Sequence, residues 1–107
     1  MYRIDLGRPR GHEQGGKRLG LVVSPGDSPL SVATVVPTST SAGRSIFRPE
    51  LEINGQPTRL LVDQVRSIDT DYIMGDPVDH LNRDELAEVE LVLAHYLGVH
   101  DASSASA

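Results

Sequence analysis

A glycine-rich polar segment, residues 11–18, contains the first side chains that could bind or transform a ligand. Its candidate residues are His12, Glu13, Gln14, Lys17 and Arg18. The segment leads into the apolar run Leu21-Val22-Val23, so these polar groups lie on a loop that is attached to a core strand. Arginine carries a planar set of N–H donors that matches phosphate oxygens, and it stays protonated. Arg18 is therefore a candidate anion-binding residue, and the alternative is a structural arginine that pairs with Glu13 or Asp63.

A run of hydroxyl side chains, Thr38-Ser39-Thr40, forms the second candidate group. These hydroxyls could bind a phosphate oxygen, although serine and threonine are also common in ordinary loops.

Glu13 and His12 titrate in a range that suits a general base, but a lone loop histidine more often has no role in catalysis. The histidines and carboxylates show no spacing typical of a metal site, and the chain has no cysteine. We expect neither a metal nor a cofactor.

Length and charge restrict the possible classes of protein. The 107 residues predict one domain, residues 1–99, followed by a disordered tail at 100–107. The absence of cysteine, of a signal peptide and of a long apolar run indicates a cytoplasmic protein without membrane spans. The net charge is −5 overall, but residues 1–66 carry a net +3 and the remaining residues a net −8. The basic first part could therefore present an anion-binding face, and the acidic part could equally be only a solvated helix.

The pattern of apolar residues predicts a mainly β protein with a C-terminal helix. We expect strands over residues 2–6, 18–24, 31–38, 46–53, 56–62 and 60–68, with one helical turn near Tyr72 and an extended piece around Val78. Asn54-Gly55 predicts a type I′ hairpin turn. Gly20 indicates a bulge or a close backbone approach, and Pro37 the end of a strand or an edge.

A helix is expected over Arg83–Leu97, with Asn82 and Glu85 as a capping box and Gly98 as the C-terminal cap. Leu86, Val89, Leu93 and Leu97 would form its apolar face. Sequential strands with short connections favour a small, strongly bent antiparallel sheet or SH3-like barrel, which the helix closes.

Two specific motifs and a shorter segment between them give the chain a resemblance to a known family. Gly11-His12-Glu13-Gln14-Gly15-Gly16-Lys17-Arg18 is followed by Val35-Val36-Pro37-Thr38-Ser39 and then by Asp63-Gln64-Val65-Arg66-Ser67-Ile68-Asp69. Over residues 2–99 the chain resembles the MazF/PemK toxin endoribonucleases. The resemblance implies a homodimer that cleaves single-stranded RNA without metal to leave a 2′,3′-cyclic phosphate. It also implies a MazE-like antitoxin that covers the RNA groove.

The resemblance assigns roles to individual residues. The key arginine of the family falls on Arg18, the catalytic threonine on Ser39, and the acid of the glycine-rich loop on Glu13. A shift of one residue would bring Thr38 or Thr40 to the hydroxyl position. Gln64 and Arg66 fall near the groove, and we expect His12, Gln14 and Lys17 to assist in substrate binding.

The chain departs from the family at Leu19, where proline is usual, at Ser39, and before the first strand, where the usual Gly-Asp/Glu is missing. The third departure leaves open whether the chain begins further upstream.

A catalytically impaired homologue that binds RNA or an antitoxin is one alternative function. A second is a toxin of the CcdB type, which shares the fold but inhibits DNA gyrase through the tip of its C-terminal helix. A Trp-containing tip would be expected there, and the chain has no Trp.

Overall fold

The computed structural model describes residues 1–8, 11, 15–25 and 31–99. The expected disorder of residues 100–107 falls outside this range. Within these residues the chain forms seven strands, two short 3₁₀ helices and one α-helix. In order these are β1 (Tyr2–Asp5), β2 (Lys17–Val22), β3 (Val32–Ser39), β4 (Glu50–Ile53), β5 (Gln56–Leu60), η1 (Val62–Gln64), β6 (Arg66–Asp69), η2 (Thr70–Tyr72), β7 (Ile73–Met74) and α1 (Arg83–Leu97).

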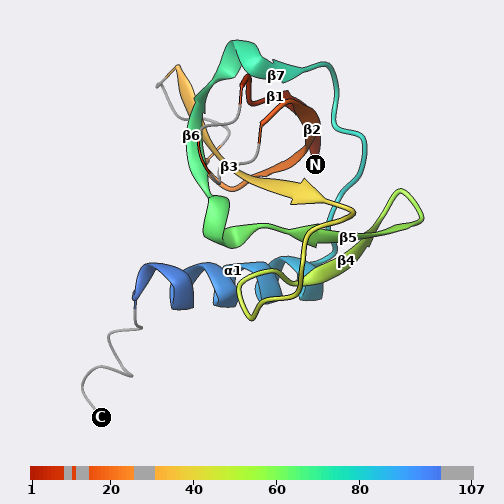
Figure 1. Ribbon diagram of the computed structural model, residues 1–107, viewed down its shortest axis with the longest axis vertical. Helices are drawn as coiled ribbons and strands as arrows, with labels where there is room; N and C mark the ends of the chain where they lie inside the picture. The colour runs from red at the N-terminus through yellow and green to blue at the C-terminus, as the bar shows by residue number, and fades with distance from the viewer. Residues whose placement is uncertain (9–10, 12–14, 26–30, 100–107) are drawn as a thin grey trace.

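The seven strands make one antiparallel sheet with the order β4-β5-β3-β2-β1-β7, and β6 pairs with β3. The sheet curls around its axis, and α1 lies beyond the β4–β5 hairpin (Figure 1). The predicted fold class is therefore confirmed. The described residues show no ladder between β6 and β7, which η2 connects, so the sheet is not a closed barrel.

Strand β3 is the centre of the sheet because it pairs with three other strands. Its first half pairs with β6, its last two residues pair with β5, and its other edge pairs with β2. Pro37 lies between the β6 and β5 ladders, and its carbonyl accepts the N–H of Leu61 at 2.8 Å. Proline has no backbone N–H to donate. None is required at Pro37, because the ladder with β6 ends at Val35 and the ladder with β5 begins at Thr38. The strand predicted over residues 31–38 is observed as Val32–Ser39. Pro37 does not end this strand, and the strand is not an edge, because it pairs on both sides.

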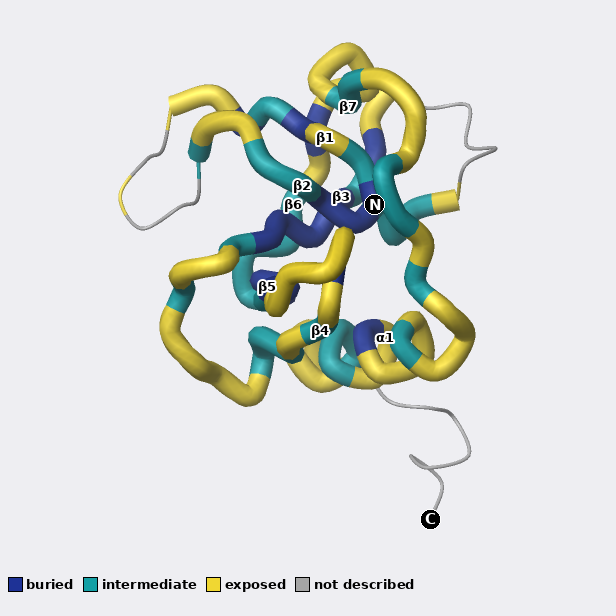
Figure 2. The backbone as a smooth tube through the Cα atoms, turned by 90° about the vertical axis from the view of Figure 1, so that its right-hand side faces the viewer, coloured by how far each residue is buried: buried dark blue, intermediate teal, exposed yellow. Residues whose placement is uncertain are grey.

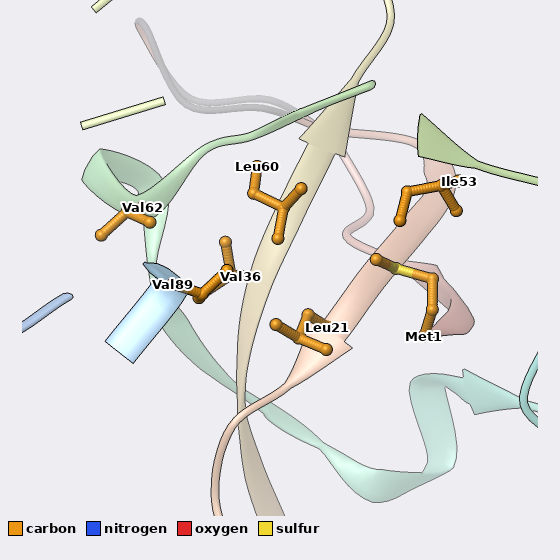
Figure 3. Packing of buried hydrophobic residues seen from close by; sticks show 7 residues of the cluster. All are labelled: Met1, Leu21, Val36, Ile53, Leu60, Val62 and Val89. Carbon is orange, nitrogen blue, oxygen red and sulfur yellow. The ribbon is translucent and has the colours of Figure 1, made fainter. Parts of the chain in front are cut away.

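Side chains alternate across β2 and β3, and this alternation produces two apolar clusters. Leu21 and Val36 belong to a cluster that reaches the hairpin, η1 and Val89 of α1. Figure 3 shows these side chains pointing toward one another. The second cluster packs around Ile4 and Val35 inside the curl of the sheet. The buried backbone in Figure 2 accordingly runs through the middle strands.

Gly20 lies where the first two strands pack most closely. A Cβ atom at this position would collide with the Cδ1 atom of Ile4, which is fully buried. The close approach expected at Gly20 is therefore present. Figure 2 shows that α1, in contrast, is largely exposed, and Val89 is its buried residue.

The local signals at the hairpin and the helix correctly predict the structure. Asn54 and Gly55 both have positive φ, 51° and 78°, in a two-residue turn. The Asn82 carboxamide accepts the N–H of Glu85, and the Glu85 carboxylate accepts the N–H of Asn82, which is the predicted capping box. Gly98 has the left-handed conformation expected of a C-terminal cap.

Further predictions about regular elements are wrong. The strand expected over residues 60–68 is interrupted by η1, where the N–H groups of Gln64 and Val65 bond to the carbonyls of Leu61 and Val62 within the turn and not to a neighbouring strand. The expected apolar face of the helix is incomplete, since Leu86 is 40% exposed and Leu97 is 58% exposed. The turn expected near Tyr72 is η2. The extended piece expected around Val78 is wrong, because β7 ends at Met74 and Val78 lies in a bend.

Candidate active site

A cleft of about 390 Å³ lies where the start of β2, the end of β3 and the β4–β5 hairpin meet. It is bounded by residues from all three segments. These are Arg18, Leu19, Thr38, Ser39, Thr40, Ser41, Ile53, Asn54, Gln56 and Thr58. Arg18 and Ser39, which are 21 positions apart in the sequence, are thus brought to one cleft.

Arg18 is held by main-chain carbonyl groups. Its Nε and Nη2 atoms donate to the carbonyl of Gly15 at 3.1 and 2.9 Å, and its Nη1 atom donates to the carbonyl of Thr38 at 2.8 Å. These bonds use three of the five N–H groups of a guanidinium. Partial burial lowers the pKa of Arg18 from its ordinary value. The guanidinium nevertheless stays charged at neutral pH, because the pKa of arginine is so high.

Asp63 does not pair with Arg18 but with Arg48. The Nε and Nη2 atoms of Arg48 donate to the two carboxylate oxygens of Asp63 at 2.9 and 2.8 Å. The hydrogen bond from Arg48 is the main reason that the pKa of Asp63 lies below its ordinary value. One of the two expected structural partners of Arg18 is therefore excluded. The other, Glu13, lies outside the described residues.

The three neighbouring hydroxyl side chains have different surroundings. Thr38 is buried, and its hydroxyl donates to the carbonyl of Leu19 at 2.8 Å. The hydroxyl oxygen of Ser39 accepts the N–H groups of Ser41 and Ala42 at 3.2 and 3.0 Å. A serine hydroxyl that accepts two hydrogen bonds still carries its own proton to donate, and the Ser41 hydroxyl oxygen lies 3.5 Å away as one acceptor. When a ligand oxygen enters the cleft, Ser39 can donate this proton to it instead.

The other candidate residues are distributed over several places. Thr40 is exposed and lines the cleft. Lys17 does not line it, but it borders a neighbouring hollow of about 260 Å³ that also touches Arg18. His12, Glu13 and Gln14 lie outside the described residues. The geometry therefore gives no position for a general base from the glycine-rich loop.

The two candidates of the second motif do not line the cleft. Gln64 is part of η1 and is half buried. Arg66 lies on β6 and borders a separate hollow of about 330 Å³, together with Asp69 and Tyr72. The Asp63–Asp69 segment thus borders a different part of the surface from Arg18 and Ser39.

Comparison with known proteins identifies the group to which this arrangement belongs. Residues 1–97 match the model of a family described as PemK-like, MazF-like toxin of type II toxin-antitoxin system. The chain belongs to this family. A Mycobacterium tuberculosis (strain ATCC 25618 / H37Rv) protein named "Putative toxin Rv3098A/RVBD_3098A" is 58% identical over 100 residues, which are 92% of this chain and 94% of that protein.

Solved structures of MazF-type proteins have the same fold. MazF from Deinococcus radiodurans superposes with a TM-score of 0.79 at 29% identity, and 92% of each chain is covered. An endoribonuclease from a mycobacterial species, solved in complex with its cognate antitoxin, has a TM-score of 0.73 at 18% identity. That comparison covers 94% of this chain and 92% of the other, and at this identity the two proteins are alike in fold. The resemblance to the MazF/PemK family is thus confirmed.

Sequence reasoning did not find the hairpin residues of the cleft, Asn54, Gln56 and Thr58. The Asn54-Gly55 turn predicted the hairpin, and alternation along β5 places Gln56 and Thr58 on the same face. No local signal indicated that this face would lie beside the end of β3. Within the described residues, no cluster of three or more histidine, aspartate or glutamate side chains could hold a metal ion. In the same residues, no helix is long and apolar enough to cross a membrane.

Proposed function

We propose that the protein is a sequence-specific endoribonuclease toxin that cleaves single-stranded RNA. The observation that supports this function best is the meeting of Arg18 and Ser39 in one cleft, with the guanidinium fixed by two carbonyl groups. An arginine that is fixed before the substrate binds can stabilise developing negative charge without reorganising during the reaction. Membership of a toxin family and a fold shared with an endoribonuclease agree with this activity.

The proposed reaction needs no nucleophile from the protein. The 2′-oxygen of the RNA attacks the adjacent phosphorus, a bond forms between them, and the bond from phosphorus to the 5′-oxygen breaks. The 2′-hydroxyl loses its proton to a base, and the leaving 5′-oxygen gains a proton. The products are a 2′,3′-cyclic phosphate and a 5′-hydroxyl. Because the RNA supplies both reacting groups, the protein has to align them, stabilise charge and move protons.

The candidate residues have separate tasks in this reaction. Arg18 stabilises the negative charge on the phosphorane, and Ser39 donates a hydrogen bond to a non-bridging oxygen. Thr38 orients the site through its bond to the Leu19 carbonyl, since its hydroxyl proton is already used. We assign the proton-accepting task to Glu13, with His12 as the alternative. Gln14, Lys17, Thr40, Gln64 and Arg66 are proposed to contact the RNA further from the reacting phosphate.

A cleavage assay tests this function. Purified protein is incubated with a sequence-diverse single-stranded RNA in EDTA, and the fragment ends are analysed. We expect fragments that end in a 2′,3′-cyclic phosphate. Arg18→Ala and Ser39→Ala should lower the rate by about 100-fold or more, as removal of one charge-stabilising group does elsewhere. Arg83→Ala, on the exposed start of α1, is the matched control and should leave the rate unchanged.

The two neighbouring hydroxyls provide an internal check. Ser39→Ala should mainly lower the cleavage rate, whereas Thr38→Val should mainly lower stability, by about 1 kcal/mol, because it leaves the partly buried Leu19 carbonyl without the Thr38 donor. If wild-type protein leaves RNA intact in EDTA and with added divalent metal, the proposed function is wrong. If Thr38→Val abolishes cleavage in a stably folded protein while Ser39→Ala does not, the two roles are reversed.

We also propose an antitoxin partner and a homodimer. A type II toxin is neutralised by a protein antitoxin, and the RNA cleft is the surface that such a partner would cover.

Exposed apolar side chains on and beside α1 support association with a second copy; they are Ile46, Leu91, Leu97 and Val99. Sedimentation of a monomer at micromolar concentration would contradict the dimer. The proposed target, cellular RNA, implies that the toxin acts in the cytoplasm.

A further inference from the structure

The cleft has a second wall, the β4–β5 hairpin, to which neither motif contributes. Register places Ile53 opposite Gln56, and side chains alternate along each strand. Ile53, Gln56 and Thr58 therefore share the hairpin face that borders the cleft, and they line it. Glu52 and Pro57, which are opposite each other, lie on the other face. The hairpin thus presents a definite set of side chains across from Arg18.

This wall is fixed in position. The N–H of Asn54 donates to the carboxylate of Asp79 at 2.9 Å, and this bond is the main reason that the pKa of Asp79 lies below its ordinary value. Asn54 itself has a φ of 51°, which asparagine tolerates better than most residues. On the strand, the hydroxyl of Thr58 donates to the carbonyl of Gln56 at 2.9 Å. A rigid element holds ligand-binding groups more precisely than a loop does.

The two walls differ in chemistry. Arg18 and Ser39 offer donors that suit an anionic phosphate, whereas Asn54 and Gln56 offer neutral carboxamides. A carboxamide has a donor beside an acceptor, which is the pattern found on the edge of a nucleobase. Proteins read single-stranded RNA through such contacts to exposed base edges. The cleft volume of about 390 Å³ is within the range of small-ligand sites, roughly 300–1,000 Å³.

We propose that Gln56 and Asn54 are specificity-determining residues that bind the base of a nucleotide next to the scissile phosphate. The inference depends on the proposed function, since it assumes that Arg18 and Ser39 hold that phosphate. The short link from a phosphate through its ribose keeps the neighbouring base within the same cleft, where Gln56 and Asn54 are the carboxamides that can bind its edge. Gln56, which lies on a strand and borders the cleft, makes the principal contact, and Asn54 at the turn closes the edge of the site.

Sequencing of fragment ends tests this inference. Wild type, Gln56→Ala, Asn54→Gly and Gln56→Glu each cleave one randomised RNA pool, and base preference is read at every position around the cut. Asn54→Gly removes the carboxamide but keeps a residue that accepts positive φ. Glu52→Gln, on the opposite face of the hairpin, is the matched control. Thermal unfolding of each variant identifies any loss of folding.

Loss of a base contact should reduce the preference for one base at one or two positions beside the cut by about 5-fold to 100-fold. We expect this result for Gln56→Ala and a smaller effect for Asn54→Gly, with no change for Glu52→Gln. Gln56→Glu replaces a donor and an acceptor with acceptors alone, so the preference should move toward guanine, whose base-pairing edge carries adjacent donors.

The outcomes separate the two proposals. An unchanged pattern of preference in folded, active Gln56 and Asn54 variants overturns the specificity role and leaves the proposed nuclease intact. If the Gln56 and Asn54 variants change base preference no more than Glu52→Gln does, the specificity role is overturned as well. Absence of cleavage by wild type refutes the nuclease itself. A variant that cleaves with the wild-type pattern but no longer binds an antitoxin would identify the hairpin wall as a protein-binding surface instead.

Discussion

The ion pair between Arg48 and Asp63 should stabilise the protein measurably, because two charge-assisted hydrogen bonds join its side chains. Their lengths are 2.9 and 2.8 Å, and the side chains are 22% and 25% exposed. Fully exposed pairs contribute about 0.2–1 kcal/mol, whereas breaking a buried pair costs about 3–5 kcal/mol. Solvent still screens a pair that is one-quarter exposed. We therefore expect a coupling free energy of about 1–2 kcal/mol.

A double-mutant cycle measures this coupling. Urea unfolding of wild type, Arg48→Met, Asp63→Asn and the double variant at pH 7 gives four free energies of unfolding, from which the pairwise contribution follows. The chain also offers a matched control in Arg59 and Glu50. Those side chains approach to 3.5 Å, and Glu50 is 52% exposed, so their coupling should be below about 0.5 kcal/mol.

The structural reasoning fails if the Arg48–Asp63 coupling is no larger than that of the control pair. It also fails if 1 M salt removes the coupling entirely, because a partly buried bidentate pair is screened less than an exposed one. The pair has a second consequence for the site. Arg48 lies near the end of the loop that begins after Ser39. The ring of the adjacent Phe47 contacts the ring of Tyr96 edge-on, with 5.2 Å between the ring centroids. The ion pair therefore anchors that loop to η1, and the ring contact anchors it to α1.

Three further changes have definite expected outcomes. Gly20→Ala should destabilise the protein by about 1–3 kcal/mol in urea unfolding, because the new methyl group overlaps buried Ile4. Asn82→Ala removes the N-terminal cap of α1 and should cost about 1 kcal/mol, seen as a lower melting temperature. Hydrogen bonds, from Asn54 above all, lower the pKa of Asp79, so its stabilising effect is present above pH 4 and is lost as the pH falls through the lowered pKa. The difference in stability between wild type and Asp79→Asn should therefore shrink in acid.

The sequence predicted best those features whose cause is local. The Asn54-Gly55 turn and the caps at Asn82 and Gly98 depend on backbone conformation and on side chains a few residues away. The break at η1 depends instead on long-range packing, because α1 and β3 both contact that segment. An apolar run such as Leu60-Leu61-Val62 is equally compatible with a strand, and its burial on all sides becomes visible only in three dimensions.

The candidate site shows the same division. The family resemblance pointed to Arg18 and Ser39, and the structure brings them to one cleft. The sequence could not indicate that Lys17, the direct neighbour of Arg18, borders a different hollow. That position depends on how β1 and β7 pack beside Lys17. The hairpin wall with Gln56 escaped prediction because its contact with the end of β3 arises from strand order, which the local pattern does not encode.

The way in which Arg18 is held has a consequence for how freely the sequence can change. Its hydrogen-bond acceptors are the main-chain carbonyl groups of Gly15 and Thr38, and every amino acid supplies such a carbonyl. A substitution at either position changes the side chain but leaves the acceptor in place as long as the backbone keeps its path. Neighbouring side chains, including those that read the substrate, can therefore diversify without displacing the charge at the centre of the cleft. New RNA specificities can then arise by mutation around an arginine that, among the described residues, donates its hydrogen bonds to main-chain carbonyl groups.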